Sequence, residues 1–335
     1  ERTAEVEAFR PELVGFYVPY PQSGRARRVA AHCHRVHGRP VVFGGVWPTT
    51  RGDDAIACPD IIGICRGEAE ASFRKLVNKM AAGEDYTRLR GFWFRKGDKI
   101  VRNQSASYVH NLDKLPIPDR SIFVGQPHMS QLPYWEFIGQ RGCPVGCTNC
   151  FHHAWMRNLK GDTNYVRFKS PEYLEAEIRD AIANYPLKVD PCIGFHDPTF
   201  TLEREWALEV CAILKDIGVP WWCNTRASHM DRDLAFVMKD AGCFEIHIGI
   251  ESGDPWIRNH VLKKDVTDEE IINAFQWCKD AGMLTFGFNM LGIPYETEES
   301  MRKTVELNRK VLPDTVFCSV FNPFPGTDLH DLVMD

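Results

Sequence analysis

The chain has 335 residues, of which 44% are hydrophobic and 25% are charged. These fractions are typical of a globular protein and exclude a disordered, collagen-like or small disulfide-stapled chain. The formal net charge is −5, which argues against bulk nucleic-acid binding, and no apolar run approaches the roughly 20 residues that span a bilayer. The length favours two domains or one large barrel.

The first part of the chain alternates short apolar runs with helical patterns. Strands are predicted at 13–18, 40–43 and 61–64, helices at 24–37 and 68–82, and a hairpin at 91–102. This alternation predicts a doubly wound, Rossmann-like α/β domain over residues 1–110. Such a sheet needs about five strands. Because we count three strands and the chain starts at Glu1 rather than Met, we expect this domain to be truncated at its N-terminus.

A Pro-rich stretch, residues 111–134, is predicted to be an extended linker to a second domain over 135–335. Strands are predicted there at 135–139, 192–196, 220–225, 244–250, 285–291 and 315–321, and helices at 171–184, 203–217, 232–241, 268–281 and 298–311. Ser170 and Thr267 stand at helix N-cap positions, and Gly218 ends a helix. The six βα units predict a partial (β/α)6 TIM-type barrel, whose chemistry lies at the C-terminal ends of the strands.

Three of the twelve cysteines lie in one loop directly after the first barrel strand. Cys143, Cys147 and Cys150 are spaced by four and three residues. Thiolates at this density are typical ligands of soft metals, and the absence of a visible secretory signal favours a reduced, cytoplasmic protein. Structural zinc would take His152 or His153 as its fourth ligand, whereas a four-iron cluster would leave one iron open for a substrate or cofactor. The spacing alone leaves both readings open.

The Cys143-x3-Cys147-x2-Cys150 loop resembles the signature of the radical S-adenosylmethionine (SAM) enzymes. Further motifs of that family follow in order at 195–200 (FHDPTF), 248–253 (IGIESG), 291–297 (LGIPYET) and 322–327 (NPFPGT). The resemblance implies that the three cysteines hold a [4Fe-4S] cluster whose fourth iron binds the amino and carboxylate groups of SAM. It also implies SAM contacts by a set of residues near the strand ends: Asp197, Arg226, Glu251, Ser252, Gly292 and Pro294. The chain departs from the family pattern at Asn149, where an aromatic residue is usual.

The N-terminal segment resembles the cobalamin-binding domain of one branch of this family, through 41–49 (VVFGGVWPT), 67–70 (GEAE) and 115–120 (LPIPDR). The resemblance implies cobalamin contacts at the C-terminal edge of the sheet by eight residues: Tyr20, Gln22, Gly44, Gly45, Val46, Trp47, Gly67 and Glu68. From the residues alone, Gly44 and Gly45 allow a ligand to approach the backbone, but they also fit an ordinary turn. His32, His34 and His37 are expected to face solvent on a helix, and we see no histidine in the spacing typical of a lower cobalt ligand.

The resemblance therefore implies a class B methyltransferase-like radical SAM enzyme. Such an enzyme cleaves SAM reductively at its cluster to a 5′-deoxyadenosyl radical, and cobalamin then delivers a methyl group to an unactivated carbon. Some relatives in this branch are instead cyclases or rearrangement enzymes, and a non-catalytic zinc or iron–sulfur protein is the alternative of another class. The expected partners are a small-molecule or peptide substrate and a flavodoxin or ferredoxin as electron donor. Lys263 and Lys264 are expected to be a solvated pair.

Overall fold

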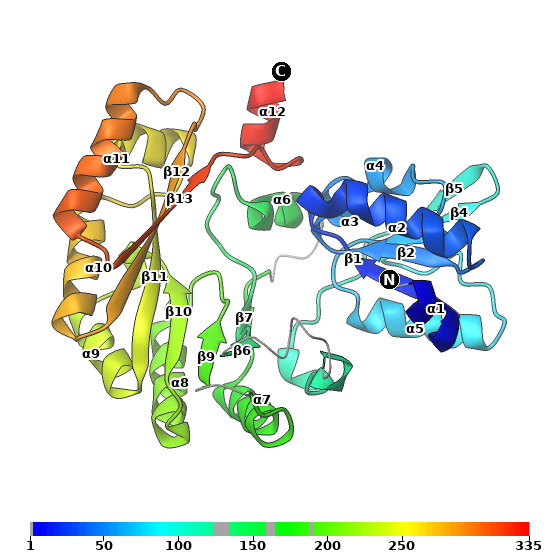
Figure 1. The fold of residues 1–335 in the computed structure, drawn as a ribbon, viewed down its shortest axis with the longest axis horizontal. Helices are drawn as coiled ribbons and strands as arrows, with labels where there is room; N and C mark the ends of the chain where they lie inside the picture. The colour runs from blue at the N-terminus through cyan, green and yellow to red at the C-terminus, as the bar shows by residue number, and fades with distance from the viewer. Residues whose placement is uncertain (1–2, 124–133, 159–164, 188–190, 335) are drawn as a thin grey trace. The chain divides into compact units, whose positions relative to one another are not determined.

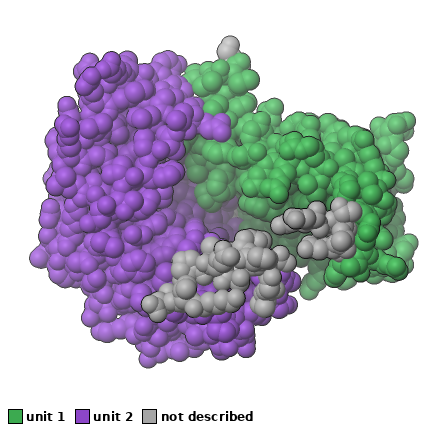
Figure 2. Space-filling model, in the orientation of Figure 1, with its two compact units in different colours: residues 1–109, 149–164, 323–335 green, residues 110–148, 165–322 purple. Residues whose placement is uncertain are grey.

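The computed structural model describes residues 3–123, 134–158, 165–187 and 191–334. The chain divides into two compact units (Figure 2). Unit 1 holds residues 1–109, 149–164 and 323–335, and unit 2 holds residues 110–148 and 165–322. The first segment of unit 1 ends at residue 109, one residue before the predicted end of the N-terminal domain. Residues 149–164 and 323–335, which were predicted to belong to the second domain, group with unit 1. The predicted domain limits themselves stay a prediction.

Unit 1 contains a five-stranded sheet in the order β1-β2-β3-β4-β5. Strands β1 (Val14–Tyr17), β2 (Val41–Gly44) and β3 (Gly63–Cys65) are parallel, and β4 (Phe92–Lys96) and β5 (Lys99–Arg102) form the predicted hairpin. The hairpin was not expected to join the sheet, but β4 pairs antiparallel with β3. It does so because Phe92 and Phe94, on one face of β4, are fully buried against the core of this unit.

Helices cover both faces of this sheet. Val41 and Phe43 of β2 pack with residues of α2 (Ser23–Arg35), whereas Val42 between them packs with residues of α5 (Glu70–Ala81). This strict alternation places one small core on each side of the sheet, as expected for a strand covered on both faces. Five short helices in the described residues of unit 1 were not predicted: α1 (Thr3–Phe9), α3 (Val46–Thr50), α4 (Gly52–Ile56), α6 (Phe151–Asn158) and α12 (Asp328–Met334).

Unit 2 contains a six-stranded parallel sheet in the order β13-β12-β11-β10-β9-β6. Its strands are β6 (Tyr134–Phe137), β9 (Cys192–Phe195), β10 (Trp221–Thr225), β11 (Cys243–Glu251), β12 (Leu284–Leu291) and β13 (Thr315–Val320). Its main helices are α7 (Pro171–Asn184), α8 (Arg204–Ile217), α9 (Arg232–Asp240), α10 (Asp268–Asp280) and α11 (Glu298–Val311). Figure 1 shows these helices along the outer side of the sheet, where one large core joins them to it.

The helix ends of unit 2 follow the predicted signals. The Ser170 hydroxyl accepts a hydrogen bond from the Tyr173 amide, and Thr267 forms a capping box with Glu270. Gly218 ends α8 in the left-handed conformation, with φ at 71°. These caps satisfy backbone groups that would otherwise lack partners, which is why the predicted limits hold closely here.

The described part of the predicted linker packs against unit 2. It contains the short turns Leu112–Lys114 and Arg120–Phe123, and residues 124–133 lie outside the described residues. The Tyr173 hydroxyl donates to the Leu115 carbonyl, and Arg120 pairs with the buried Glu177 at 3.2 Å. None of the described helices combines the length and apolar character that a bilayer crossing requires.

Candidate active site

The cysteine loop starts from a buried anchor. Asp197, directly after β9, is fully buried, and its two carboxylate oxygens accept hydrogen bonds from the Gly139 and Gln140 amides at 3.2 and 2.5 Å. The Gln140 side chain in turn donates to the Gly142 carbonyl at 2.8 Å. Burial raises the pKa of Asp197 to about 7, although both amides and Lys169 lower it. A chain of hydrogen bonds therefore runs from Asp197 to the residue before Cys143.

Gly142 marks the point where the chain turns into the loop. Its φ is +85°, and a Cβ there would lie 2.3 Å from the Tyr165 carbonyl oxygen. Gln140–Arg141 (β7) pairs antiparallel with Arg167–Phe168 (β8), a strand pair that was not predicted. Because the backbone passes so close to Tyr165, glycine is the residue that fits this turn.

The middle of the loop is held from another side. Thr148, next to Cys147, donates from its amide to the Leu262 carbonyl at 3.0 Å and from its hydroxyl to the Val261 carbonyl at 2.6 Å. Both carbonyls belong to a turn of π-helix, Ile257–Val261, and the residue after it. Turns of this kind often occur at functional sites. The loop is thus held by hydrogen bonds just before Cys143 and just after Cys147.

The three cysteines are partly exposed, and none of the twelve cysteines in the chain is in a disulfide. Burial raises the pKa of Cys143, while the nearby cations Arg226 and Lys264 lower it. In the described residues, no three His, Cys, Asp or Glu side chains stand close enough together to hold a metal ion. The cysteines as cluster ligands therefore stay a prediction, supported by the chemistry of three adjacent thiols.

An ion pair lies at the C-terminal end of β11. Glu251, with φ at +66°, pairs with the Lys264 ammonium at 3.1 Å. A Cβ on Gly249 would lie 2.5 Å from the Glu251 carboxylate and 2.7 Å from the Lys264 nitrogen, so this glycine leaves the space that the pair fills. The expectation of a solvated lysine pair is wrong for Lys264, because its side chain is 11% exposed and reaches back over β11.

Arg226, at the end of β10, secures the segment that carries Lys264. Its guanidinium donates to the carbonyls of Lys264 and Asp265, and the residue is buried. Lys263 and Asp265, which flank Lys264, both have positive φ, at 51° and 52°. Strained conformations of non-glycine residues cluster at functional sites. The structure therefore brings Arg226, Glu251 and Lys264 together near Cys143, and the sequence analysis missed Lys264.

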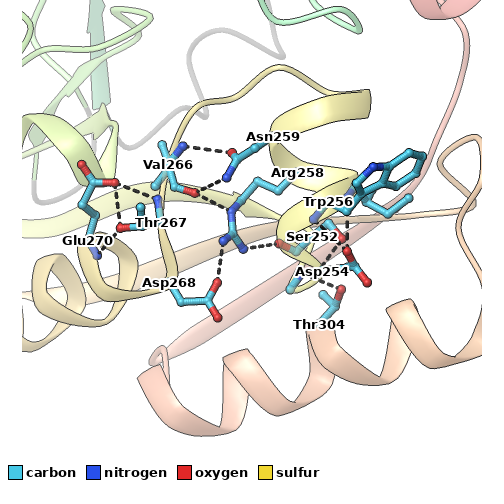
Figure 3. A network of polar contacts seen from close by, with 12 residues as sticks. Ser252, Asp254, Trp256, Arg258, Asn259, Val266, Thr267, Asp268, Glu270 and Thr304 are labelled. Atoms are coloured by element: carbon cyan, nitrogen blue, oxygen red, sulfur yellow. Dashed lines mark hydrogen bonds and ion pairs between the residues drawn. The ribbon is translucent and has the colours of Figure 1, made fainter.

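Figure 3 shows the network beneath this segment. Arg258 is fully buried and donates to the Val266 and Ser252 carbonyls, both at 2.8 Å, and to the Asp268 carboxylate at 2.5 Å. Asn259 binds the backbone of Val266 through both its amide nitrogen and its amide oxygen. Arg258 was not singled out in the sequence analysis, because an arginine in the segment between the predicted strand at 244–250 and the predicted helix at 268–281 looks like a surface residue.

Two of the predicted SAM contacts serve the scaffold in this structure. Asp197 and Ser252 are both fully buried, with their oxygens bonded to backbone groups or to Arg258. A ligand contact needs exposed surface, so the burial of these two side chains does not support a direct contact with SAM. Such a contact stays a prediction. Gly292 is exposed in a turn after β12 with φ at +78°, held by Glu296 at 2.6 Å, and Pro294 is half-buried.

The residues predicted for cobalamin lie at or next to the C-terminal edge of the unit 1 sheet. Tyr20 and Gln22 form a short turn after β1. Gly44 ends β2 and Val46 begins α3. Gly45 has φ at +96°, and a Cβ there would lie 2.8 Å from the Tyr17 ring. Tyr17 itself is 73% exposed at this edge.

Three other side chains of unit 1, those of Trp47, Glu68 and His37, are buried or bonded within the unit. Trp47 is fully buried and donates to Asp54 at 2.9 Å, so its indole packs the core and is not presented to a ligand. The Glu68 carboxylate accepts from the Val109 amide, and Gly67 donates from its amide to Thr49. The side chain of His37 is 6% exposed, so the expectation that it faces solvent is wrong.

Unit 1 also joins three separate motifs. Helix α6 (Phe151–Asn158) starts directly after Cys150 and packs against α3 (Val46–Thr50). Arg157 of α6 donates to the Gly326 carbonyl at 2.7 Å, and a Cβ on Gly326 would lie 3.2 Å from Thr50. The segment after the third cysteine, the Gly-Gly turn after β2 and the motif at 322–327 are therefore parts of one packed structure.

Several known proteins are similar to this chain over nearly its whole length. An uncharacterized methyltransferase of Pyrococcus horikoshii is 26% identical over 97% of this chain and 70% of that protein. An anaerobic magnesium-protoporphyrin IX monomethyl ester cyclase of Rubrivivax gelatinosus is 25% identical over 99% of this chain and 60% of the cyclase. The radical S-adenosylmethionine methyltransferase TsrM from Kitasatospora setae has the same fold, with a TM-score of 0.79 at 19% identity over 98% of this chain and 66% of that one.

These proteins are longer than the present chain, which spans between 60% and 70% of each. The sequence model of the Radical SAM superfamily matches residues 137–307, just over half of the chain. That match covers Cys143, Cys147 and Cys150 and reaches from β6 into α11. The chain belongs to the Radical SAM superfamily.

Proposed function

We propose that this radical SAM enzyme uses cobalamin to methylate an unactivated carbon atom. In this proposal, unit 1 supplies a Rossmann-like cobalamin-binding domain, and the six-stranded sheet of unit 2 is a partial (β/α)6 barrel. The observation that carries it is that one chain combines a tethered three-cysteine loop with a second α/β sheet that presents Tyr17 and Gly45 at its C-terminal edge. The methyltransferase names of the relatives support it.

The donor set fits an iron–sulfur cluster. Cys143, Cys147 and Cys150 would hold it through three thiolates, which are the ligands that such clusters prefer. When bound, the cluster supplies the electron that SAM cleavage requires. Arg226 and Lys264 place positive charge beside Cys143, which favours its thiolate form.

The ion pair at the end of β11 fits the charged end of SAM. Glu251 is an acceptor for an ammonium or hydroxyl donor, and Lys264 is a cation for a carboxylate. Arg226 holds the Lys264 backbone and so fixes where that cation stands. We infer that Gly249 is needed at this point of β11, because a side chain there would displace both partners of the pair.

The edge of the unit 1 sheet fits a large flat ligand such as cobalamin. Tyr17 presents an exposed ring there, and the turn at Gly44–Gly45 carries no side chain. When bound, cobalamin supplies the methyl group that is transferred. A structure of TsrM with cobalamin and a [4Fe-4S] cluster bound, with a TM-score of 0.79 at 18% identity, supports this placement as a fold-level likeness.

A cyclase is the second candidate function, and the name of the Rubrivivax relative favours it. The two functions differ in product mass, because methylation adds a methyl group and cyclisation does not. In either case we propose a small-molecule or peptide substrate and a flavodoxin or ferredoxin as electron donor.

The proposal is tested by replacing Cys147 with alanine, with Cys318→Ala as the control because Cys318 is exposed on β13. After anaerobic reconstitution we expect about four irons and one cobalt per wild-type chain, loss of 5′-deoxyadenosine formation in C147A, and wild-type behaviour in C318A. Zinc with little iron, or unchanged 5′-deoxyadenosine formation in C147A, would contradict it.

A further inference from the structure

The unit 2 sheet has a second face, which lies opposite the helices. Trp135, Phe137, Ile246 and Ile248 point into the core shared with the helices. Because side chains alternate along a strand, the residues between them point to the opposite face. The six strands contain three glutamates, Glu136, Glu245 and Glu251, and no lysine or arginine. This face is therefore acidic by composition.

A continuous band of rings crosses this face. We call it the aromatic face and define it by Tyr134, Trp222, His247, Phe286, Phe288 and Phe317. Trp222 stacks on His247 at 4.6 Å between centroids and contacts Tyr134 at 5.7 Å. His247 contacts Phe286 at 4.7 Å, and Phe288 continues the band to Phe317 at 6.0 Å. The band thus runs from β6 to β13, across the full width of the sheet.

Two imidazole–carboxylate pairs lie along this band. Glu245 binds His247 at 2.7 Å on the same strand, and Glu136 of β6 lies 3.3 Å from His196, which follows β9. The His196 ring also meets Trp222 edge-on at 5.0 Å. The two pairs therefore contact the same indole. They place hydrogen-bond acceptors beside it.

One glycine makes room for this indole. A Cβ on Gly194 of β9 would lie 2.5 Å from the Trp222 ring, so the indole extends over the neighbouring strand. The centre of the band is buried, with Trp222 9% exposed and the His247 side chain 13% exposed. The Glu136 and His196 side chains, near one end, are 49% and 39% exposed. Phe317, at the other end, is 50% exposed. A ligand on this face would therefore reach the Glu136 carboxylate and the His196 ring at one end of the band, and the Phe317 ring at the other.

We propose that the aromatic face binds the substrate and takes a planar conjugated ring that carries N–H or ammonium donors. This inference rests on the proposed function. Side chains on a strand stand upright from the sheet, so rings that stack on each other across strands turn their edges outward. Ring edges are partly positive and prefer the π face of another ring. The carboxylates of Glu136 and Glu245 favour donors or a positive charge at the rim of that ring. The Lys264 ammonium reaches over Gly249, but it does not repel a positively charged ligand strongly, since it is already paired with Glu251.

The test is a binding experiment on the full chain with three probes, read by saturation-transfer NMR and calorimetry. Tryptamine has a planar ring and a cationic amine, indole-3-propionate has the same ring with a carboxylate, and 2-cyclohexylethylamine has the amine without the planar ring. We expect tryptamine to bind most tightly, with indole-3-propionate and 2-cyclohexylethylamine each weaker by roughly fivefold or more.

Two substitutions locate the binding. Trp222→Leu removes the buried indole against which Tyr134 and His196 pack, and Glu136→Gln removes a carboxylate whose side chain is 49% exposed. Each is expected to weaken tryptamine binding by roughly fivefold. The matched controls are Phe236→Leu and Glu205→Gln, which change an exposed ring and an exposed carboxylate on α9 and α8. Both controls are expected to bind like the wild type.

Equal binding of 2-cyclohexylethylamine and tryptamine would overturn the inference, as would unchanged binding in E136Q and W222L with intact folding. Formation of 5′-deoxyadenosine from SAM is measured on the same samples. Cleavage without selective probe binding refutes this inference and leaves the proposed function standing. Selective binding without cleavage supports the aromatic face and refutes the proposed function.

Discussion

Replacing Asp197 with alanine removes the acceptor of the two amides that start the cysteine loop, those of Gly139 and Gln140. Each buried donor left without a partner costs about 1–3 kcal/mol, so the loss of stability is about 2–6 kcal/mol. Asp197→Asn keeps one acceptor oxygen and turns an amide nitrogen toward the other donor, so its cost is about half of that. The loop start loosens in both variants. We expect iron retention to weaken roughly tenfold, as for other residues that orient metal ligands.

The asparagine variant also has a distinct pH dependence. Burial raises the pKa of Asp197 from 3.8 to about 7, so between these values the folded protein holds a proton that the unfolded chain releases. Wild-type stability from this group is therefore greatest below the lower value and falls as the pH rises toward the upper one. A shift of this size corresponds to at most about 4 kcal/mol. The asparagine side chain does not titrate, so the stability difference between D197N and wild type shrinks from pH 5 to pH 8.

Urea denaturation at several pH values measures both effects, together with iron per chain after anaerobic reconstitution. Asp216→Asn is the control, since Asp216 is an exposed carboxylate of the same unit, with 75% of its side chain accessible. Wild-type iron retention in D197A, or parallel stability curves for wild type and D197N over this pH range, would refute the reasoning.

Three further predictions follow from the same site. Lys264→Met leaves its carboxylate partner unpaired and is expected to weaken SAM binding roughly tenfold by calorimetry, whereas Lys263→Met, on an exposed side chain, binds normally; equal affinities would contradict the pairing. Arg258→Met removes a fully buried cation and is expected to lower the free energy of unfolding by about 3–5 kcal/mol in urea; a change within about 0.5 kcal/mol would show that the network is dispensable. Gly142→Ala forces a Cβ against the Tyr165 carbonyl, so reconstituted iron falls while the thiol titre stays constant; full iron loading would rule out the close approach.

Much of the fold could be predicted from local sequence signals. The helices at 171–184 and 298–311 have the predicted limits, because their caps are encoded within a few residues of each end. The six strands of unit 2 were also predicted, since each is a short apolar run bounded by turn residues. The pairing of β4 with β3 was not, because strand pairing depends on which apolar face finds a partner, and a hairpin carries no signal for that.

The candidate site divides in the same way. The spacing of Cys143, Cys147 and Cys150 is a property of the chain itself, and so is the Gly-Gly turn after β2. Their chemistry could therefore be read from the residues. Lys264 could not be identified in this way, because Lys-Lys in a polar stretch looks solvated until the loop folds back over Gly249.

The sequence by itself determined the elements, their order and the thiol donor set, since these depend on residues that are near neighbours along the chain. Only the tertiary structure decided which side chains meet. It made Asp197 a buried anchor of the cysteine loop, and it placed Trp222 and His247 on one face of the sheet. The physical reason is that burial and ion pairing depend on distance in space. Residues that are many positions apart in the chain come close together only after the sheet has formed.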